Sequence, residues 1–269
     1  MTDPGKIKLL VSDVDGTLIT GDKVLTERTR RAVLALKDKG IRFAICSGRP
    51  PRGMEMFVEP LDLEEPIAAY NGGAITTPQM KVLEAHALPG DVAGAAVQRL
   101  SSLGLDVWLY LPQDWLLRDP DGPHVAREAW TVKFQARVVE DYTPYLAQTA
   151  KIVGVSDDYP RVAKAEADES RALSGRASVS RSQPYYLDIT SPLANKAHVV
   201  EYLARSTGIP LDAICTAGDG LNDVLMFEKS GFSIAMGNAS DEVKSKAHEV
   251  TASNEEDGLA KAIEKFLLA

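Results

Sequence analysis

The chain has 269 residues, of which 45% are hydrophobic and 25% charged, a composition typical of a folded globular protein with one large or two ordinary domains. Its net charge of −8 provides no basic surface of the kind that binds nucleic acid or acidic membranes, so we expect neither partner. The same charge repels phosphorylated molecules at long range, and a phosphate ligand would therefore need a local positive pocket.

The first third of the chain alternates strand and helix patterns. Thr26 is suited to cap a helix over residues 27–39, which Gly40 would end. The turn signal at residues 71–73 joins a strand to a hairpin. The strands predicted around these features lie at residues 7–12, 41–46, 66–70, 74–76 and 82–85. Such alternation is typical of βαβ units on a parallel sheet.

A different composition follows in residues 88–187, which hold all three tryptophans and six of the eight tyrosines. Two helices are predicted here, at residues 91–102 and 159–173. Strand patterns lie at residues 106–111, 152–155 and 185–189. This mixture predicts a separate α+β domain inserted into the first one.

The βα alternation returns after Pro192. Asn195 is suited to cap a helix over residues 196–207. The remaining predicted elements are strands at 213–217 and 232–235 and helices at 221–229, 240–247 and 256–268. We therefore predict an α/β fold: a Rossmann-like, doubly wound parallel-sheet core of residues 1–87 and 188–269, with an inserted α+β domain of residues 88–187.

The N-terminus lacks the apolar segment of a signal peptide, and no stretch approaches the length of a membrane span. We therefore expect a cytoplasmic protein, as a monomer or homodimer. Cys46 and Cys215 lie in apolar runs and are interpreted as buried free thiols. The four histidines are scattered without the spacing of a zinc motif.

The strongest chemical signal is the pair Asp13 and Asp15, which follows the apolar run at residues 9–11. Carboxylates at the C-terminal end of a parallel strand lie where open α/β sheets bind ligands. Two acids so close repel each other, and a hard cation would compensate them. The pair therefore suggests a Mg²⁺ site with one carboxylate free to attack, the alternative being an ordinary acidic turn.

Two further positions are suited to phosphate. Ser47 follows the second predicted strand, where its hydroxyl and nearby backbone N–H groups suit a phosphate oxygen. Lys196 begins a predicted helix, where its charge opposes the macrodipole unless an anion is near. A plain turn and a solvated lysine are the alternatives for these two positions.

A last cluster, at residues 218–223, places Asp219, Asn222 and Asp223 directly after an apolar strand, with two glycines among them. Ligands that offer only oxygen suit Mg²⁺ rather than zinc. A turn of small polar residues is again the alternative.

Taken in order, these four segments resemble the motifs of the haloacid dehalogenase-like hydrolase superfamily. Further segments are similar to its Cof-type phosphatases of subfamily IIB: 47–50, 71–73, 236–239 and 253–258. The position of the insertion resembles the C2 cap type, although the insertion itself matches only in length and outline. Ala197 departs from the glycine that is usual after the motif lysine, which we expect to matter little in a helix.

The resemblance implies a Mg²⁺-dependent reaction through a phosphoaspartate. Asp13 would attack phosphorus, and Asp15 would protonate the leaving alcohol and then activate water. Asp13, Asp15 through its backbone carbonyl, and Asp219 would bind the metal. Ser47 and Lys196 would hold the phosphoryl oxygens.

The resemblance also implies supporting positions around this centre. Asn222 and Asp223 would orient the metal, its waters or the phosphate. The predicted substrate-binding residues are Gly48, Arg49, Asn71 and Gly72. The predicted function is hydrolysis of small phosphorylated metabolites, foremost sugar phosphates. A phosphosugar mutase of the same cap class and a noncatalytic phosphosugar sensor are the alternatives.

Overall fold

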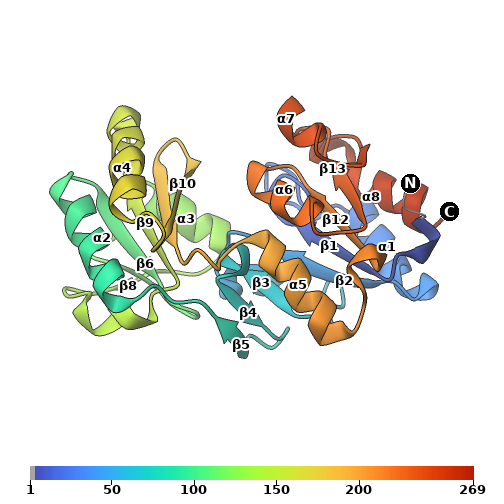
Figure 1. The fold of residues 1–269 in the computed structure, drawn as a ribbon, viewed down its shortest axis with the longest axis horizontal. Coiled ribbons are helices and arrows are strands. Elements are labelled where there is room, and N and C mark those ends of the chain that lie inside the picture. Colours follow the sequence, from blue (N-terminus) through green and yellow to red (C-terminus); the bar gives the residue numbers. More distant parts are fainter. Residues whose placement is uncertain (1–3) are drawn as a thin grey trace.

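The computed structural model describes residues 4–269, which form two lobes, each built around its own sheet (Figure 1). The larger sheet has the strand order β14-β13-β12-β1-β2-β3-β4-β5. Its pairs are parallel from β14 through β3 and antiparallel from β3 to β5. The strands are β1 (Leu9–Asp13), β2 (Arg42–Cys46), β3 (Ile67–Ala69), β4 (Ala74–Thr76), β5 (Val82–Ala85), β12 (Ile214–Gly218), β13 (Phe232–Ala235) and β14 (Glu249–Val250).

Helices cover both faces of this sheet. Along β1, Leu10 packs in one apolar cluster with Val33 and Leu259, whereas Leu9 packs in another with Val199. This alternation is what a strand buried on both faces requires. The helices are α1 (Glu27–Ala35) and α8 (Gly258–Ala262) on the first face, α5 (Lys196–Thr207) and α6 (Leu221–Phe227) on the second, and the short α7 (Asp241–Lys244) beside α6. The predicted doubly wound α/β fold is therefore confirmed.

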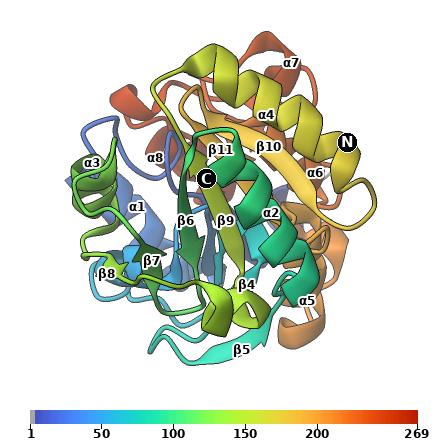
Figure 2. The ribbon, with the colours of Figure 1, turned by 90° about the vertical axis from the view of Figure 1, so that its left-hand side faces the viewer.

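The second sheet has the order β10-β11-β9-β6-β7-β8. Its strands are β6 (Asp106–Tyr110), β7 (Trp115–Leu117), β8 (Arg137–Val138), β9 (Lys151–Val155), β10 (Ser178–Gln183) and β11 (Tyr186–Thr190). The helices α2 (Gly90–Ser102) and α4 (Tyr159–Ala172) cover its outer face, and α3 (Val125–Val132) lies at the side (Figure 2).

The opposite face of this sheet is turned toward the larger lobe. In β6, Leu109 packs under α2 and α4, whereas Trp108 and Tyr110 join the apolar cluster that continues into the larger lobe. Because β11 ends at Thr190, this sheet runs past the predicted boundary at residue 187. The division of the chain into two domains stays a prediction, and we place its second boundary after β11.

Short turns complete the chain. Short 3₁₀ segments occupy Pro4–Lys6, Lys37–Lys39, Pro51–Phe57, Tyr70–Gly72, Thr143–Gln148, Leu211–Ala213 and Asn254–Glu256, and a π-helical segment occupies Ile263–Leu267. The predicted helix at 27–39 is thus an α-helix that ends at Ala35, followed by a 3₁₀ turn that Gly40 closes with a left-handed φ of 67°. Within residues 4–269, we find no helix with the length and apolar character needed to cross a membrane.

Candidate active site

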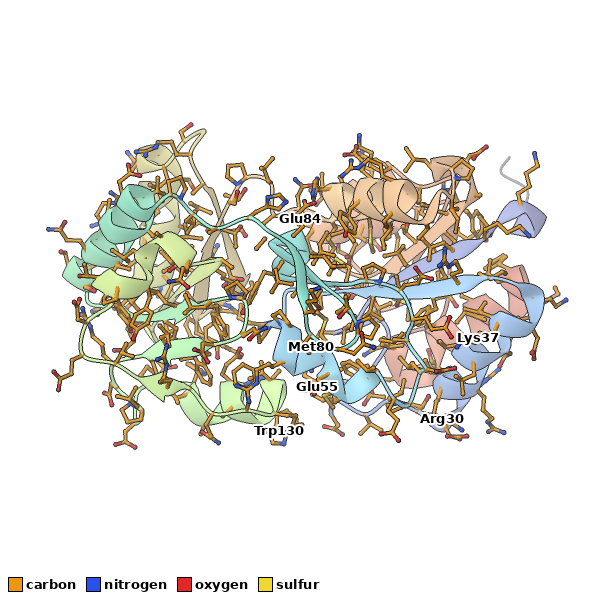
Figure 3. All side chains as sticks on the ribbon, turned by 90° about the horizontal axis from the view of Figure 1, so that it is seen from below. Arg30, Lys37, Glu55, Met80, Glu84 and Trp130 are labelled. Carbon is orange, nitrogen blue, oxygen red and sulfur yellow. The ribbon has the colours of Figure 1, made fainter. Side chains whose placement is uncertain are left out.

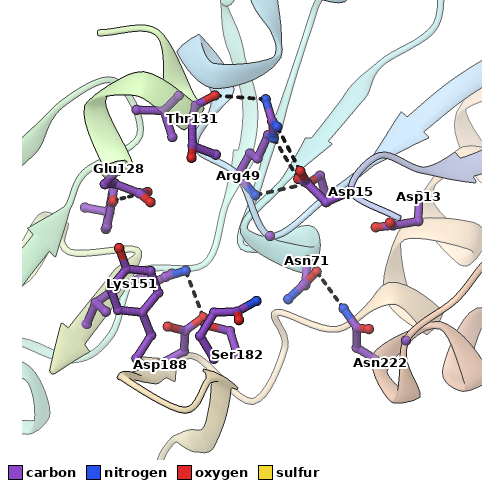
Figure 4. Close-up of a pocket in the computed structure, with 18 of the residues that line it drawn as sticks. Asp13, Asp15, Arg49, Asn71, Glu128, Thr131, Lys151, Ser182, Asp188 and Asn222 are labelled. Carbon is purple, nitrogen blue, oxygen red and sulfur yellow. Dashed lines mark hydrogen bonds and ion pairs between the residues drawn. The ribbon is translucent and has the colours of Figure 1, made fainter. Parts of the chain in front are cut away.

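Three neighbouring strands of the larger sheet end at the same edge, where the predicted site residues meet. β1 lies between β2 and β12, so Asp13 at the end of β1 comes close to Ser47 and Asp219, which follow the other two strands. These residues line a cavity of about 310 Å³ whose opposite wall belongs to the second sheet and α3 (Figure 4). The cavity therefore lies at the carboxyl ends of parallel strands, as predicted.

Lys196 is buried at the base of this site. Its Nζ lies 2.5 Å from Asp13 Oδ1 and 2.5 Å from Asp223 Oδ1. Burial alone would lower the pKa of Lys196, but the charges of the two carboxylates outweigh it and raise this pKa well above its usual value. The anion that a lysine at a helix N-terminus requires is thus supplied by the protein itself.

Asp223 holds the loop that carries Asp219. Its Oδ2 accepts the backbone N–H groups of Asp219 at 2.9 Å and Gly220 at 2.8 Å. Gly218 permits this approach, because a Cβ there would lie 2.3 Å from the Asp223 carboxyl carbon. Both oxygens of Asp223 are therefore engaged by Lys196 and the backbone, which gives this residue an orienting role.

Asp13, Asp219 and Asp223 present carboxylate oxygens that all lie within 4.8 Å of one another. Burial, chiefly, and the neighbouring acids raise the pKa of Asp13 well above its usual value. Burial and the charge of Asp223 likewise raise the pKa of Asp219 to about 6. Crowded carboxylates that resist ionisation fit a divalent cation that prefers oxygen ligands, which would offset their charge.

The Asp15 side chain does not join this acidic group. Arg49 donates two hydrogen bonds to its carboxylate, at 2.7 and 2.8 Å, and Lys23 donates a third at 2.7 Å. Burial would raise the pKa of Asp15, but these contacts outweigh it and lower that pKa to about 2. The backbone carbonyl of Asp15 is therefore the part of this residue that is left to bind a metal, as the resemblance implies.

Arg49 connects this carboxylate to the second lobe. Its guanidinium also donates to the backbone oxygen of Thr131 in α3 at 3.2 Å (Figure 4). It donates to the backbone oxygen of Gly53 at the same distance. Arg49 is only 5% exposed. The position of α3 and the environment of Asp15 are therefore linked through one side chain.

The predicted substrate-binding residues fall into two groups. Gly48, Arg49 and Asn71 line the cavity, and Asn71 Oδ1 accepts a hydrogen bond of 3.2 Å from Asn222. Gly72 is not among the described residues that line it. This glycine has a φ of 98°, and a Cβ there would lie 2.9 Å from Val199 in α5. The structure thus places Gly72 in the packing between the hairpin and α5.

Three further residues at the site were not selected from the sequence. Thr17 donates to Asp219 Oδ1 at 2.9 Å, and Asn238 donates to the backbone oxygen of Gly16 at 2.9 Å and to Asp219 Oδ2 at 3.3 Å. Lys23 binds Asp15, as described above. Thr17 and Asn238 belong to segments quoted for the resemblance, whereas no pattern around Lys23 distinguishes it from a surface lysine.

The cavity wall that the second sheet and α3 form, opposite the larger lobe, carries polar groups on an aromatic surface. Lys151 binds Asp188 Oδ2 at 2.8 Å, and the Tyr110 hydroxyl donates to Glu128 at 2.6 Å. Two buried atoms of this wall, the Tyr186 hydroxyl and Asp188 Oδ1, have no hydrogen-bond partner among the described residues. Unpaired buried polar atoms in a cavity wall are suited to a polar ligand.

Comparison with known proteins gives a consistent result. The family model of haloacid dehalogenase-like hydrolases matches residues 10–263. A 5-amino-6-(5-phospho-D-ribitylamino)uracil phosphatase of Bacillus subtilis is 29% identical, over 96% of this chain and 97% of its own. A pyridoxal phosphate phosphatase of Escherichia coli is 26% identical, over 97% and 99%. The solved structure of a haloacid dehalogenase-like hydrolase from Bacteroides thetaiotaomicron is 30% identical, over 96% and 99%, with a TM-score of 0.89.

Proposed function

Because the chain belongs to the haloacid dehalogenase-like hydrolase family, we propose that it hydrolyses sugar or polyol phosphates in a Mg²⁺-dependent reaction through a phosphoaspartate on Asp13. Its family and its phosphatase relatives make the chain an enzyme, a phosphatase of small phosphorylated metabolites. The substrate class, the metal and the covalent intermediate are the parts that we propose. The cytoplasmic location and the monomeric or dimeric state stay predictions.

In the first step, a carboxylate oxygen of Asp13 forms a bond to phosphorus while the bond from phosphorus to the alcohol oxygen breaks. That oxygen takes a proton from Asp15. In the second step, Asp15 removes a proton from water, whose oxygen attacks phosphorus and restores the Asp13 carboxylate. Lys196, held beside Asp13, offsets the negative charge of the phosphoryl group throughout.

Asp15 must carry a proton before it acts as the acid, and its contacts with Arg49 and Lys23 oppose this. A phosphate that enters the cavity competes for the same two cations. If Arg49 and Lys23 turn to the phosphate, Asp15 loses the contacts that stabilise its charge, while its burial continues to favour the protonated form. We infer that substrate binding itself prepares Asp15 for proton transfer.

The metal would be bound by Asp13, Asp219 and the backbone carbonyl of Asp15. Mg²⁺ at this position would neutralise charge on the phosphoryl oxygens and help to orient them. The crowded carboxylates and their raised pKa values support this assignment. Asp223 would then orient the metal ligand Asp219, whose backbone N–H it accepts. Asn222 would orient the waters of the metal or the phosphate.

The single observation that carries the substrate class is the unpaired pair on the cavity wall, Tyr186 Oη and Asp188 Oδ1. A ligand with several hydroxyl groups satisfies both atoms, because a hydroxyl donates to the carboxylate and accepts from the phenol. An apolar leaving group would leave both unsatisfied, which costs about 1–3 kcal/mol for each buried atom. A cavity of about 310 Å³ also limits the ligand to a small molecule.

Phosphorus NMR of one reaction distinguishes hydrolysis of the phosphoaspartate from transfer of its phosphoryl group to a second sugar hydroxyl. A hexose 1-phosphate incubated with the enzyme and Mg²⁺ should give inorganic phosphate and free sugar, because water reaches the phosphoaspartate. Isomerisation to the 6-phosphate without release of phosphate, especially after priming with a hexose bisphosphate, would establish a mutase instead. Full activity in excess EDTA would contradict the Mg²⁺ assignment.

A panel of phosphorylated metabolites tests the substrate class. Sugar and polyol phosphates should have the highest kcat/KM, and Tyr186→Phe should lower kcat/KM for them more than for phenyl phosphate, which has no hydroxyl on its leaving group. Equal losses for both kinds of substrate would mean that Tyr186 does not recognise hydroxyl groups.

A further inference from the structure

Three polar side chains converge on one point outside the catalytic cavity: those of Glu84, His86 and His198. The Nε2 atoms of the two histidines are 3.2 Å apart. His198 Nε2 lies 2.7 Å and His86 Nε2 2.8 Å from the same oxygen, Glu84 Oε1. We propose that this cluster is a binding site for a divalent transition-metal ion, with Zn²⁺ as its representative.

Local structure explains how three residues so far apart in sequence meet. Glu84 and His86 are two positions apart along the edge strand β5 and its extension, so they share one face. The backbone N–H of His86 donates to Gly73 at 2.8 Å, which keeps this residue in register. His198 lies in the first turn of α5, where its backbone N–H donates to the Asn195 side chain at 2.9 Å.

The spacing of the three atoms is close to that of a metal site. Tetrahedral Zn²⁺ with bonds of about 2.0–2.1 Å to nitrogen places its ligand atoms about 3.3 Å apart. The two nitrogens are already at 3.2 Å, and a small outward movement of Glu84, whose side chain is 31% exposed, would complete the geometry. Two nitrogens and one oxygen favour Zn²⁺ over Mg²⁺, and three ligands leave a fourth position for water.

Hydrogen bonding alone satisfies this arrangement poorly. Both imidazole nitrogens face the same carboxylate oxygen and each other, so two N–H groups directed at Glu84 would bring their hydrogens together. A cation at the centre would accept a lone pair from each of the three atoms instead. The side chains of His86 and His198 are 15% and 19% exposed, which leaves the site shielded but open to ions.

The site lies where the chain passes between the two lobes. His86 is two residues before Leu88, whose backbone N–H donates to Thr149 of the second lobe, and Glu84 lies between the lobes in Figure 3. His198 follows the returning segment and is two residues after Lys196. A bound ion would therefore fasten β5 to the start of α5, and we expect it to stabilise the fold.

Competition with a chromophoric chelator tests the site in the full-length, metal-stripped protein. An Asp13→Asn/Asp219→Asn background removes the carboxylate site, so that any Zn²⁺ that remains bound reports the histidine cluster. We expect one Zn²⁺ per chain in this background and at least roughly tenfold weaker binding after His86→Ala or His198→Ala. The melting temperature should rise with Zn²⁺ in the background protein but not in these variants.

His248→Ala is the matched control, because this histidine binds Ser233 at 2.7 Å, outside the cluster. It should retain full Zn²⁺ binding. Glu84→Gln, which keeps the shape of the side chain, serves if a histidine variant misfolds, and it should also weaken binding. No Zn²⁺ bound in the background protein, or binding unchanged by all three cluster variants, would overturn the proposal.

Discussion

Lys196 is a buried cation whose two nearest charged partners, Asp13 and Asp223, are carboxylates. A buried charge is tolerated only when its partners remain, and removal of one partner of a buried pair is often strongly destabilising. Here the second carboxylate gives protection, because Asp223 keeps Lys196 paired when Asp13 is changed. The nucleophile can therefore be replaced without leaving the lysine unpaired.

For this reason, Asp13→Asn should reduce steady-state phosphatase activity below detection while the protein still folds. An amide is a poor nucleophile but has nearly the shape of the carboxylate. Activity assays and circular dichroism of the purified variant check both parts. Asp22→Asn makes the same chemical change at an exposed position of the following loop and should retain activity. Steady-state turnover by Asp13→Asn would disprove the assignment of the nucleophile.

Glu128 provides a pH-dependent prediction away from the metal ligands. Burial, chiefly, raises the pKa of Glu128 above its usual value, against the opposing effect of the Tyr110 hydrogen bond. The folded state thus favours the protonated acid, and its contribution to stability is lost as the pH rises through the folded-state pKa. Glu128→Gln does not ionise, so its melting temperature relative to wild type should increase between pH 4 and pH 8.

Thermal unfolding at several pH values measures this difference. Glu140→Gln removes one carboxylate at an exposed position of the same lobe and serves as the matched control. A melting-temperature difference for Glu128→Gln that is constant or decreases toward pH 8 would show that the Glu128 carboxylate is not destabilised by burial.

At the level of helices and strands, the sequence predicted those elements whose residues carry strong local signals. The hairpin at 74–76 and 82–85, the strand at 232–235 and the helix at 196–207 all lie at the predicted residues. Others were missed because their signals are weak. β10 has a mostly exposed, polar sequence, and α3 begins after His124 in a left-handed conformation with no side-chain cap. Both are positioned by tertiary pairing rather than by local preference.

The same distinction applies to the site. Asp13, Lys196 and Asp219 were predicted because each follows a strand or begins a helix within a recognisable segment. The pairing of Asp15 with Arg49 and Lys23, and the meeting of His86 with His198, depend on how distant segments pack. A single sequence contains no period or spacing that reports such contacts.

The helix α5 gives a prediction at this scale, because its first turn presents both Lys196 and His198. Asn195 caps it, and its Oδ1 accepts the backbone N–H of His198 at 2.9 Å. Asn195→Ala should lower the free energy of unfolding by about 1 kcal/mol, whereas Asn195→Asp retains an acceptor and should lose less. Thermal or urea unfolding compares the two variants. Equal losses of unfolding free energy would show that the side-chain acceptor at residue 195 does not stabilise the helix.

In the whole molecule, two sets of residues have separate places in the sequence: those proposed to recognise the leaving group and those proposed for phosphoryl transfer. Asp13, Asp219 and Lys196 belong to the larger lobe, and Tyr186 and Asp188 to β11 of the second sheet. If each lobe folds as a domain, substrate choice can change while the chemistry persists. Arg49 is the exception, because it contacts Asp15 in one lobe and Thr131 in the other.

An exchange of lobes tests this division. Residues 88–190, which include all of β11, would be replaced by the matching segment of a relative with a different substrate preference. The chimera should adopt the preference of the donor, measured as kcat/KM across a panel of phosphate monoesters, and should still lose activity after Asp13→Asn. The exchange must keep a backbone carbonyl in the position of Thr131, because loss of this contact with Arg49 would disturb the Arg49–Asp15 pair and lower kcat for every substrate alike. A uniform loss would therefore indicate a broken Arg49 contact, whereas an unchanged preference at normal kcat would place substrate recognition in the larger lobe.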